Sequence, residues 1–394
     1  MSPTTDILRQ KLDALQRNAL ICGVIGVIVI VILGLRDSQQ FFRSYLFSFI
    51  FWICMPLGCM AVLMLHHLTG GRWGLPIRRI MEAGSRTIGL MAVLFLPILF
   101  GMKSLYLWAN AAIVQNDAIL QQKRWWLNPT GFVVRCVIYF ALWWLIAGLL
   151  NKWSREQDAT GNPELADRME ILSAPGVVIW GFVLTGASID WVMSLEPHWY
   201  STIYGLMFIV IAALAGFSFT IFILRMLSDY PPVKDCVAPN HYNDLGNILL
   251  AFVMLWAYLS FSQLLIIWAG NLKEEIPWYV QRAFGGWAPI GVALVVFHFF
   301  VPFLLLLQRG VKKRLRTLSF VSGWIVVLSL LDVYWIVVPS WDKAQPHFHL
   351  SDIFALLGIG GLWVGAFAWQ LKRLPLLPLH DPRFEGVLLH EHAD

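Results

Sequence analysis

Four side chains that can carry protons or bind a small polar molecule lie inside long apolar stretches of this 394-residue chain: Asp190, Gln263, His298 and Asp332. An ionisable group at membrane depth is costly, so it usually faces a helix-bundle interior or a water-filled cavity. A carboxylate or histidine whose pKa is set by such surroundings can accept and release protons. These residues are therefore our first candidates for chemistry, as parts of a hydrated proton path or of a binding pocket.

Small and polar residues accompany both carboxylates. Gly186 shares a helical face with Asp190, and Ser329 shares one with Asp332. Small residues at these spacings indicate that neighbouring helices, rather than lipid, cover the faces concerned. Both carboxylates are therefore expected to point into the protein.

Two prolines mark further polar positions. Pro197 ends the stretch that precedes it, which places Glu196 and His198 at the outer surface. His298 precedes Pro302 by four residues, and because proline has no N–H, the carbonyl of His298 loses its helical partner. A polar atom is thus freed in the middle of an apolar stretch.

Each candidate also has a structural alternative. Asp190 and Asp332 could pair with Arg135 or Lys103 and do no more than hold helices together. His298 could be a hydrogen-bonded packing residue rather than a ligand. The sequence leaves the chemical and the structural interpretations open.

The composition restricts the class of protein and of cofactor. Hydrophobic residues make up 58% of the chain and charged residues 13%, with a mean hydropathy of +0.66, whereas a soluble domain carries about 25% charged residues. The five cysteines form no C-x-x-C pattern, which argues against an iron–sulfur cluster, a structural zinc or a covalently bound haem. A bis-histidine haem b is also unexpected, because it needs a second histidine in the middle of the membrane besides His298, and His66 and His67 lie at the end of their apolar stretch. We expect no metal site in this chain.

Ten apolar runs are each long enough to cross a bilayer as a helix. They are too long for barrel strands and do not alternate in polarity, so the predicted fold class is an all-α polytopic membrane protein with about ten transmembrane helices. We predict an amphipathic cytoplasmic lead-in over residues 1–18, one membrane domain over 19–371 and a cytoplasmic tail over 372–394. The runs are 19–35, 46–65, 88–107, 133–150, 175–195, 203–224, 248–269, 287–307, 318–338 and 353–369.

The distribution of basic residues predicts the topology. Twenty of the 29 Lys and Arg residues lie in the N-terminal segment, the tail and the loops on their side, which places both termini in the cytoplasm. The segment 308–316 (QRGVKKRLR) contributes most; we interpret it as a topology signal, the alternative being a contact with anionic lipid or a partner. On the outer side, the connection 103–130 is the longest, and a surface helix is predicted over 109–122.

Three stretches resemble a known family. Residues 188–205 (SIDWVMSLEPHWYSTIYG), residues 122–144 (QKRWWLNPTGFVVRCVIYFALWW, with Arg135) and residues 278–282 (WYVQR) are similar to the F subunit (ActF) of bacterial alternative complex III, a quinol:cytochrome c oxidoreductase. The resemblance covers essentially the whole chain in length and number of spans. It identifies the chain as an NrfD/PsrC-like membrane subunit of the bacterial inner membrane.

The resemblance implies two four-helix bundles, spans two to five and six to nine, flanked by spans one and ten. It also implies electron transfer from quinol to cytochrome c or another high-potential acceptor. The implied partners are a sister NrfD-like membrane subunit, an outer iron–sulfur subunit, haem c subunits, membrane lipids and a terminal oxidase. No nucleic acid is expected as a partner. Because the sister subunit usually holds the quinol site, this chain is expected to act as scaffold and proton route. The implied proton-handling positions are Asp190, Glu196 and His198, to which Asp332 is added from its own setting; Arg135, Gln263 and His298 complete the candidate set.

Two rival functions remain. The first is a catalytic quinol pocket within this subunit, lined by Asp190 and His198, with quinone or quinol as its ligand. The second is a free-standing secondary transporter. The sequence argues against the transporter because it contains no pair of Gly- or Pro-broken spans at matched positions.

Overall fold

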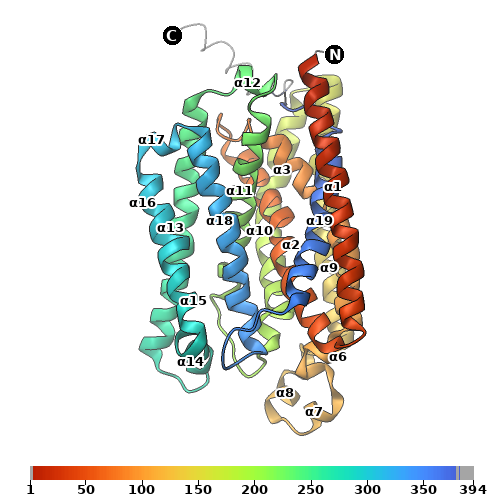
Figure 1. Ribbon diagram of the computed structural model, residues 1–394, viewed down its shortest axis with the longest axis vertical. Helices are drawn as coiled ribbons and strands as arrows, with labels where there is room; N and C mark the ends of the chain where they lie inside the picture. Colours follow the sequence, from red (N-terminus) through yellow and green to blue (C-terminus); the bar gives the residue numbers. More distant parts are fainter. Residues whose placement is uncertain (1–2, 379–380, 382–394) are drawn as a thin grey trace.

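The computed structural model describes residues 3–378 and residue 381. Helices make up 82% of the structure, and its described part contains no strand. Ten of the described helices are long and apolar enough to cross a membrane, which confirms the predicted fold class (Figure 1). The protein is a multi-pass α-helical membrane protein. Its spans are Ile7–Gly34, Ser38–Thr69, Arg78–Phe100, Pro129–Thr160, Glu164–Leu195, Tyr204–Leu227, Pro239–Gly270, Gly285–Leu307, Leu315–Ser340 and Leu350–Leu371.

Most spans are built around one long helix, and two are broken. The long helices are α1 (Pro3–Gly34), α2 (Ser38–Thr69), α9 (Pro129–Thr160), α10 (Glu164–Trp191), α11 (Tyr204–Leu227), α13 (Pro239–Gly270), α18 (Leu315–Val337) and α19 (Leu350–Leu371). The third span consists of α3 (Arg78–Ser85), α4 (Ile88–Leu94) and α5 (Leu96–Phe100). The eighth consists of α15 (Ala288–Ala293), the π-helix η5 (Leu294–Phe300) and α16 (Val301–Leu307). Short helices in the connections are α6 (Met102–Leu105), α7 (Ala111–Gln115), α8 (Ala118–Gln122), α12 (Val233–Cys236), α14 (Ile276–Ala283) and α17 (Arg309–Lys312).

The spans form two bundles and a flanking pair. Spans two to five pack together, as do spans six to nine, while α1 lies along α19. The bundles meet where α2 crosses α11, and glycine makes this approach possible: a Cβ added to Gly58 would lie 1.9 Å from the carbonyl oxygen of Ala212, and one on Gly216 would lie 2.6 Å from the Gly58 backbone. The seam between the bundles therefore depends on residues without side chains.

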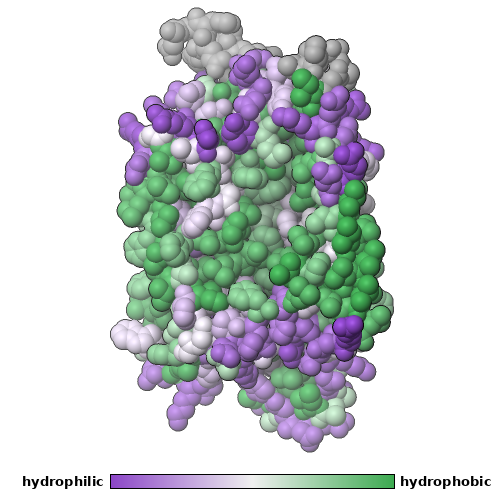
Figure 2. Space-filling model, in the orientation of Figure 1, coloured by the Kyte–Doolittle hydropathy of each residue, from purple (hydrophilic) through white to green (hydrophobic). Residues whose placement is uncertain are grey.

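The two flanking helices are antiparallel. Asp13 near the start of α1 pairs with Lys372 just after α19, and Gly23 lies against the backbone of Gly361. α1 thus begins and α19 ends at one end of the molecule, called here the terminal side, and α7 and α8 lie at the opposite end, called the loop side (Figure 1). A hydrophobic belt separates polar surfaces at the two ends (Figure 2).

The third span begins at Arg78 and not at residue 88 as predicted. The sequence here looks like a loop because it carries Arg78, Arg79 and Glu82. In the structure these charges are buried and paired: Arg78 Nε lies 3.0 Å from Glu82 Oε1, Arg79 Nη1 lies 2.8 Å from Glu82 Oε2, and Asp381 and Asp158 supply the remaining negative charge. Paired charges at i, i+3 and i, i+4 spacing can therefore extend a helix that hydropathy alone ends.

Two surface segments also differ from simple expectation. The single helix predicted over 109–122 is wrong; α7 and α8 replace it, because the Asp117 carboxylate accepts the N–H groups of Ile119 and Leu120 and so starts a new helix. At the N-terminus, the lead-in is helical from Pro3 and continues into the first span without a break. The tail beyond residue 381 lies outside the described residues.

A candidate proton-handling site

Asp190 is fully buried and holds the first bundle together. Arg135 donates to it through Nε (2.7 Å, to Oδ2) and Nη2 (2.9 Å, to Oδ1). Tyr139 Oη and Trp126 Nε1 each donate one further hydrogen bond of 2.9 Å. The carboxylate thus accepts four hydrogen bonds, two of them from one guanidinium in a bidentate pair. This is the structural alternative raised from the sequence: Asp190 ties α10 to α9.

Glu196 and Arg282 join two of the sequence stretches singled out above. Glu196 Oε1 accepts from Arg282 Nη2 (2.7 Å) and from Ser340 Oγ (2.9 Å). Arg282 is completely buried and also donates to the carbonyls of Trp335 (3.2 Å) and Ile336 (2.8 Å) at the end of α18. Burial lowers the pKa of Arg282, and the adjacent Glu196 carboxylate opposes that effect. Residues 188–205 and 278–282 thus meet on the loop side in one ion pair, in which Arg282 is buried and Glu196, predicted at the outer surface, is 18% exposed.

His198 lies outside this cluster. Its side chain is 49% exposed, and its Nε2 lies 2.6 Å from Asp117 Oδ2. Hydrogen bonds from the Leu120 N–H and from His198 lower the pKa of Asp117. His198 therefore lies at the surface, as predicted, and fastens the α7–α8 segment to the loop after α10.

Asp332 has a different setting from Asp190. It is only 4% exposed, in the second bundle, and one hydrogen bond reaches it from the indole Nε1 of Trp256 on α13 (2.9 Å to Oδ2). Within the described part of the chain, no Lys, Arg or His forms an ion pair with it. A buried carboxylate without a cation is expensive in its charged form, so protonation is the inexpensive way to neutralise it. Asp332 is the acid in this protein that is best placed to take up and release a proton.

His298 lies beside the same tryptophan, and Gln263 lies two helical turns farther along α13. The His298 ring centroid lies 4.5 Å from that of Trp256, and His298 belongs to the π-helix η5, four residues before Pro302. The missing N–H of that proline accounts for the local widening of the helix. Gln263 is 1% exposed, and its amide atoms have no hydrogen-bond partner among the described residues. Spans eight and nine therefore each place one polar side chain, His298 and Asp332, against Trp256 of span seven.

Tyr204 connects Asp332 with the loop-side ion pair. It is fully buried at the start of α11 and interacts electrostatically with Asp332, Glu196 and Arg282. The two carbonyls that Arg282 binds follow Asp332 on α18 by three and four residues, which is about one helical turn, or roughly 5 Å. Asp332 and Glu196 thus both lie within electrostatic range of Tyr204, and Asp332 lies about one helical turn from the carbonyls that Arg282 binds. We call Asp332, Tyr204 and Glu196 the relay.

Sequence reasoning found the ionisable members of this arrangement but missed the aromatic ones. Tyr204 and Trp256 lie in apolar runs, where nothing in the sequence distinguishes a hydrogen-bonding aromatic residue from a packing one. It also missed a buried charge cluster on the terminal side, where Arg79 pairs with Asp158 and Arg78 with Asp381. The signal that was available there is the i, i+3 and i, i+4 spacing of Arg78, Arg79 and Glu82.

Comparison with known protein families finds no family model that matches this chain, and comparison with curated proteins finds no match either.

Proposed function

We propose that this chain is an integral membrane subunit of a quinol-oxidising respiratory complex of the alternative complex III type, in a bacterial cytoplasmic membrane. In this proposal it is the scaffold for a sister membrane subunit, an outer iron–sulfur subunit and haem c subunits, and it carries protons through its second bundle. Both termini then lie in the cytoplasm, and the loop side faces outward, where the electron acceptors are.

Two observations support the assignment to this class. The resemblance in residues 188–205, 122–144 and 278–282 implies two four-helix bundles with two flanking spans, and the spans pack in that arrangement. In addition, Glu196 and Arg282, which belong to separate stretches of the resemblance, form one partly buried pair with an N–O distance of 2.7 Å. A shared ion pair gives a physical reason for both stretches to occur in one chain.

The relay is the observation that carries the proton route. Oxidation of a quinol releases two electrons and two protons; the electrons pass to the redox centres of the partners, and the protons need acceptors that lead outward. Asp332 has no cationic partner in the described chain and can alternate between its acid and carboxylate forms. In this proposal the hydroxyl of Tyr204, which lies within electrostatic range of both Asp332 and Glu196 and can donate one proton while accepting another, carries the proton from Asp332 toward Glu196.

Asp190 has no part in this route. Its charge is balanced by Arg135, and its two oxygens already accept four hydrogen bonds. Protonation would have to break a bidentate pair that occupies both oxygens, whereas Glu196 receives its hydrogen bonds from Arg282 and Ser340 on Oε1 alone, so Asp190 is the poorer proton carrier. The proposal therefore assigns the proton route to the second bundle alone.

Purification from native membranes through an affinity tag tests the proposal. The expected preparation contains haem c, seen by its absorption spectrum, contains iron–sulfur centres, seen by electron paramagnetic resonance, and oxidises quinol with reduction of an acceptor. A quinone photolabel is expected on the sister subunit. A chain that purifies alone, without redox centres, and still transports a solute would contradict the proposal and support a secondary transporter; photolabel on this chain would support its own quinol pocket.

A further inference from the structure

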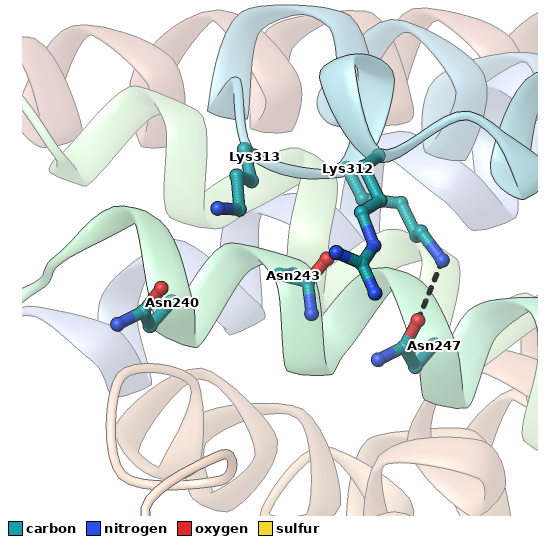
Figure 3. Close-up of a pocket in the computed structure, with 6 residues that line it drawn as sticks. Asn240, Asn243, Asn247, Lys312 and Lys313 are labelled. Atoms are coloured by element: carbon teal, nitrogen blue, oxygen red, sulfur yellow. Dashed lines mark hydrogen bonds between the residues drawn. The ribbon is translucent and has the colours of Figure 1, made fainter.

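A polar pocket of about 390 Å³ opens on the terminal side, between the start of α13 and the corner formed by α16 and α17 (Figure 3). Three amides from one face of α13 line it, together with three cations from the segment that follows α16, and no carboxylate of the described residues lines it. The lining residues are Asn240, Asn243, Asn247, Arg309, Lys312 and Lys313.

The lining of the pocket is held in place by packing and hydrogen bonding. Lys312 is only 7% exposed, and its Nζ donates to Asn247 Oδ1 at 2.6 Å. Its aliphatic stem lies against Gly246, where an added Cβ would come within 2.6 Å of the Lys312 Cγ atom. A lysine that served only as a topology signal would have no need of a glycine to seat it or an amide to orient it. The seating of Lys312 thus gives a reason to pursue the lipid-contact interpretation of segment 308–316.

The lining defines the chemistry of the ligand. Arginine and lysine donate charge-assisted hydrogen bonds to phosphate oxygens, and asparagine amides add neutral donors. Three formal positive charges around one pocket favour an anion with several acceptor oxygens. A phosphate group fits this donor set.

The position of the pocket indicates where the phosphate comes from. α17 lies at the boundary between the polar terminal side and the hydrophobic belt (Figures 1 and 2). Directly before it, Leu304 and Leu307 of α16 are 57% and 52% exposed on the lipid-facing surface. A phosphate bound in the pocket thus has an apolar surface next to it on which acyl chains can lie.

We infer that this pocket binds the headgroup phosphate of an anionic phospholipid, whose acyl chains lie along α16. The site is independent of the relay, because Lys312 and Asn247 belong to the terminal side and Asp332 lies in the half of α18 toward the loop side. A phosphate bound there contacts both α13 and α17, and it therefore stabilises the connection between spans eight and nine.

Two double variants test the inference with equal loss of charge from the same segment. Arg309→Gln with Lys313→Gln removes two pocket cations, whereas Arg314→Gln with Arg316→Gln removes two cations that do not line the pocket. Detergent-solubilised protein is titrated with phosphatidylglycerol and, separately, with phosphatidylcholine, and bound lipid is counted by native mass spectrometry. The pocket variant is expected to bind phosphatidylglycerol about tenfold more weakly than wild type, and the control variant within about twofold of it.

Three results would overturn the inference. Equal weakening in both double variants would reduce the effect to general surface charge. Equal binding of phosphatidylglycerol and phosphatidylcholine by wild type would show that the pocket does not select an anionic headgroup. Inorganic phosphate that displaces phosphatidylglycerol at equal concentration would identify a soluble phosphate, and not a lipid, as the ligand. Gly246→Ala supplies an independent check, because displacing the Lys312 stem should weaken phosphatidylglycerol binding while all charges remain.

Discussion

Removing the arginine of the Asp190 ion pair gives the sharpest stability prediction. In Arg135→Gln, the fully buried Asp190 loses two charge-assisted hydrogen bonds of 2.7 and 2.9 Å and keeps those of Trp126 and Tyr139. Removing one partner of a buried pair leaves an uncompensated charge and costs about 3–5 kcal/mol. Asp190→Asn removes that charge, so the double variant should recover about 2 kcal/mol relative to the sum of the two single variants.

The measurement is reversible unfolding of the purified protein in mixed micelles with increasing sodium dodecyl sulfate, followed by tryptophan fluorescence. The free energies of wild type, both single variants and the double variant give the coupling energy directly. A loss below about 1 kcal/mol in Arg135→Gln, or strictly additive effects, would refute the description of Asp190 as a charged helix anchor.

Three further outcomes follow from other parts of the structure. Gly58→Ala should destabilise the protein by about 3 kcal/mol because the added methyl meets backbone across the bundle seam, whereas Gly148→Ala, with nothing within 4 Å of the new atom, should stay within about 1 kcal/mol of wild type in the same unfolding assay. The pKa of Asp117 is lowered, so the stability that its carboxylate gives to the α7–α8 segment is fully present above pH 3.8 and is lost as the pH falls through the lower folded-state pKa. Limited proteolysis within residues 111–122 should therefore increase only in that acidic range. Asp117→Asn should remove this dependence on pH. Arg282→Lys should cost about 2–4 kcal/mol because lysine cannot reproduce the fork that binds Glu196 and the α18 carbonyls; full stability of that variant would contradict the role given to this pair.

The sequence predicts the fold well because its main determinant is local. Twenty apolar residues in a row are enough to specify a membrane-spanning helix, whatever they later contact. The third span is the instructive exception. Arg78 and Arg79 are charged, so hydropathy places the start of the helix later; their partner Glu82 is local, but Asp158 and Asp381 come from distant parts of the chain. Whether a charge is neutralised depends on those distant partners, which one sequence does not reveal.

The same distinction applies to the site. Arg135 could be named in advance as a partner for Asp190 because few cations occur at membrane depth. For Asp332, two cationic partners were considered, and the structure supplies a neutral donor, Trp256, instead. Tyr204 has no signal in the sequence, since its position near Asp332 comes only from the packing of α11 against α18. Ionisable residues stand out from an apolar background, and hydrogen-bonding aromatic residues do not.

Proton release in Asp332→Asn tests the central claim most directly. The complex is reconstituted into liposomes, and the rate of proton release to the outside during quinol oxidation is measured with a pH-sensitive dye. Asp352→Asn is the matched control: its carboxylate is also buried but accepts from Ser44 Oγ (2.5 Å) and the His349 N–H (2.9 Å), away from the relay. The account predicts at least tenfold slower proton release in Asp332→Asn with the complex intact, and wild-type release in the control. Wild-type proton release in both variants would contradict it and leave the chain as a scaffold.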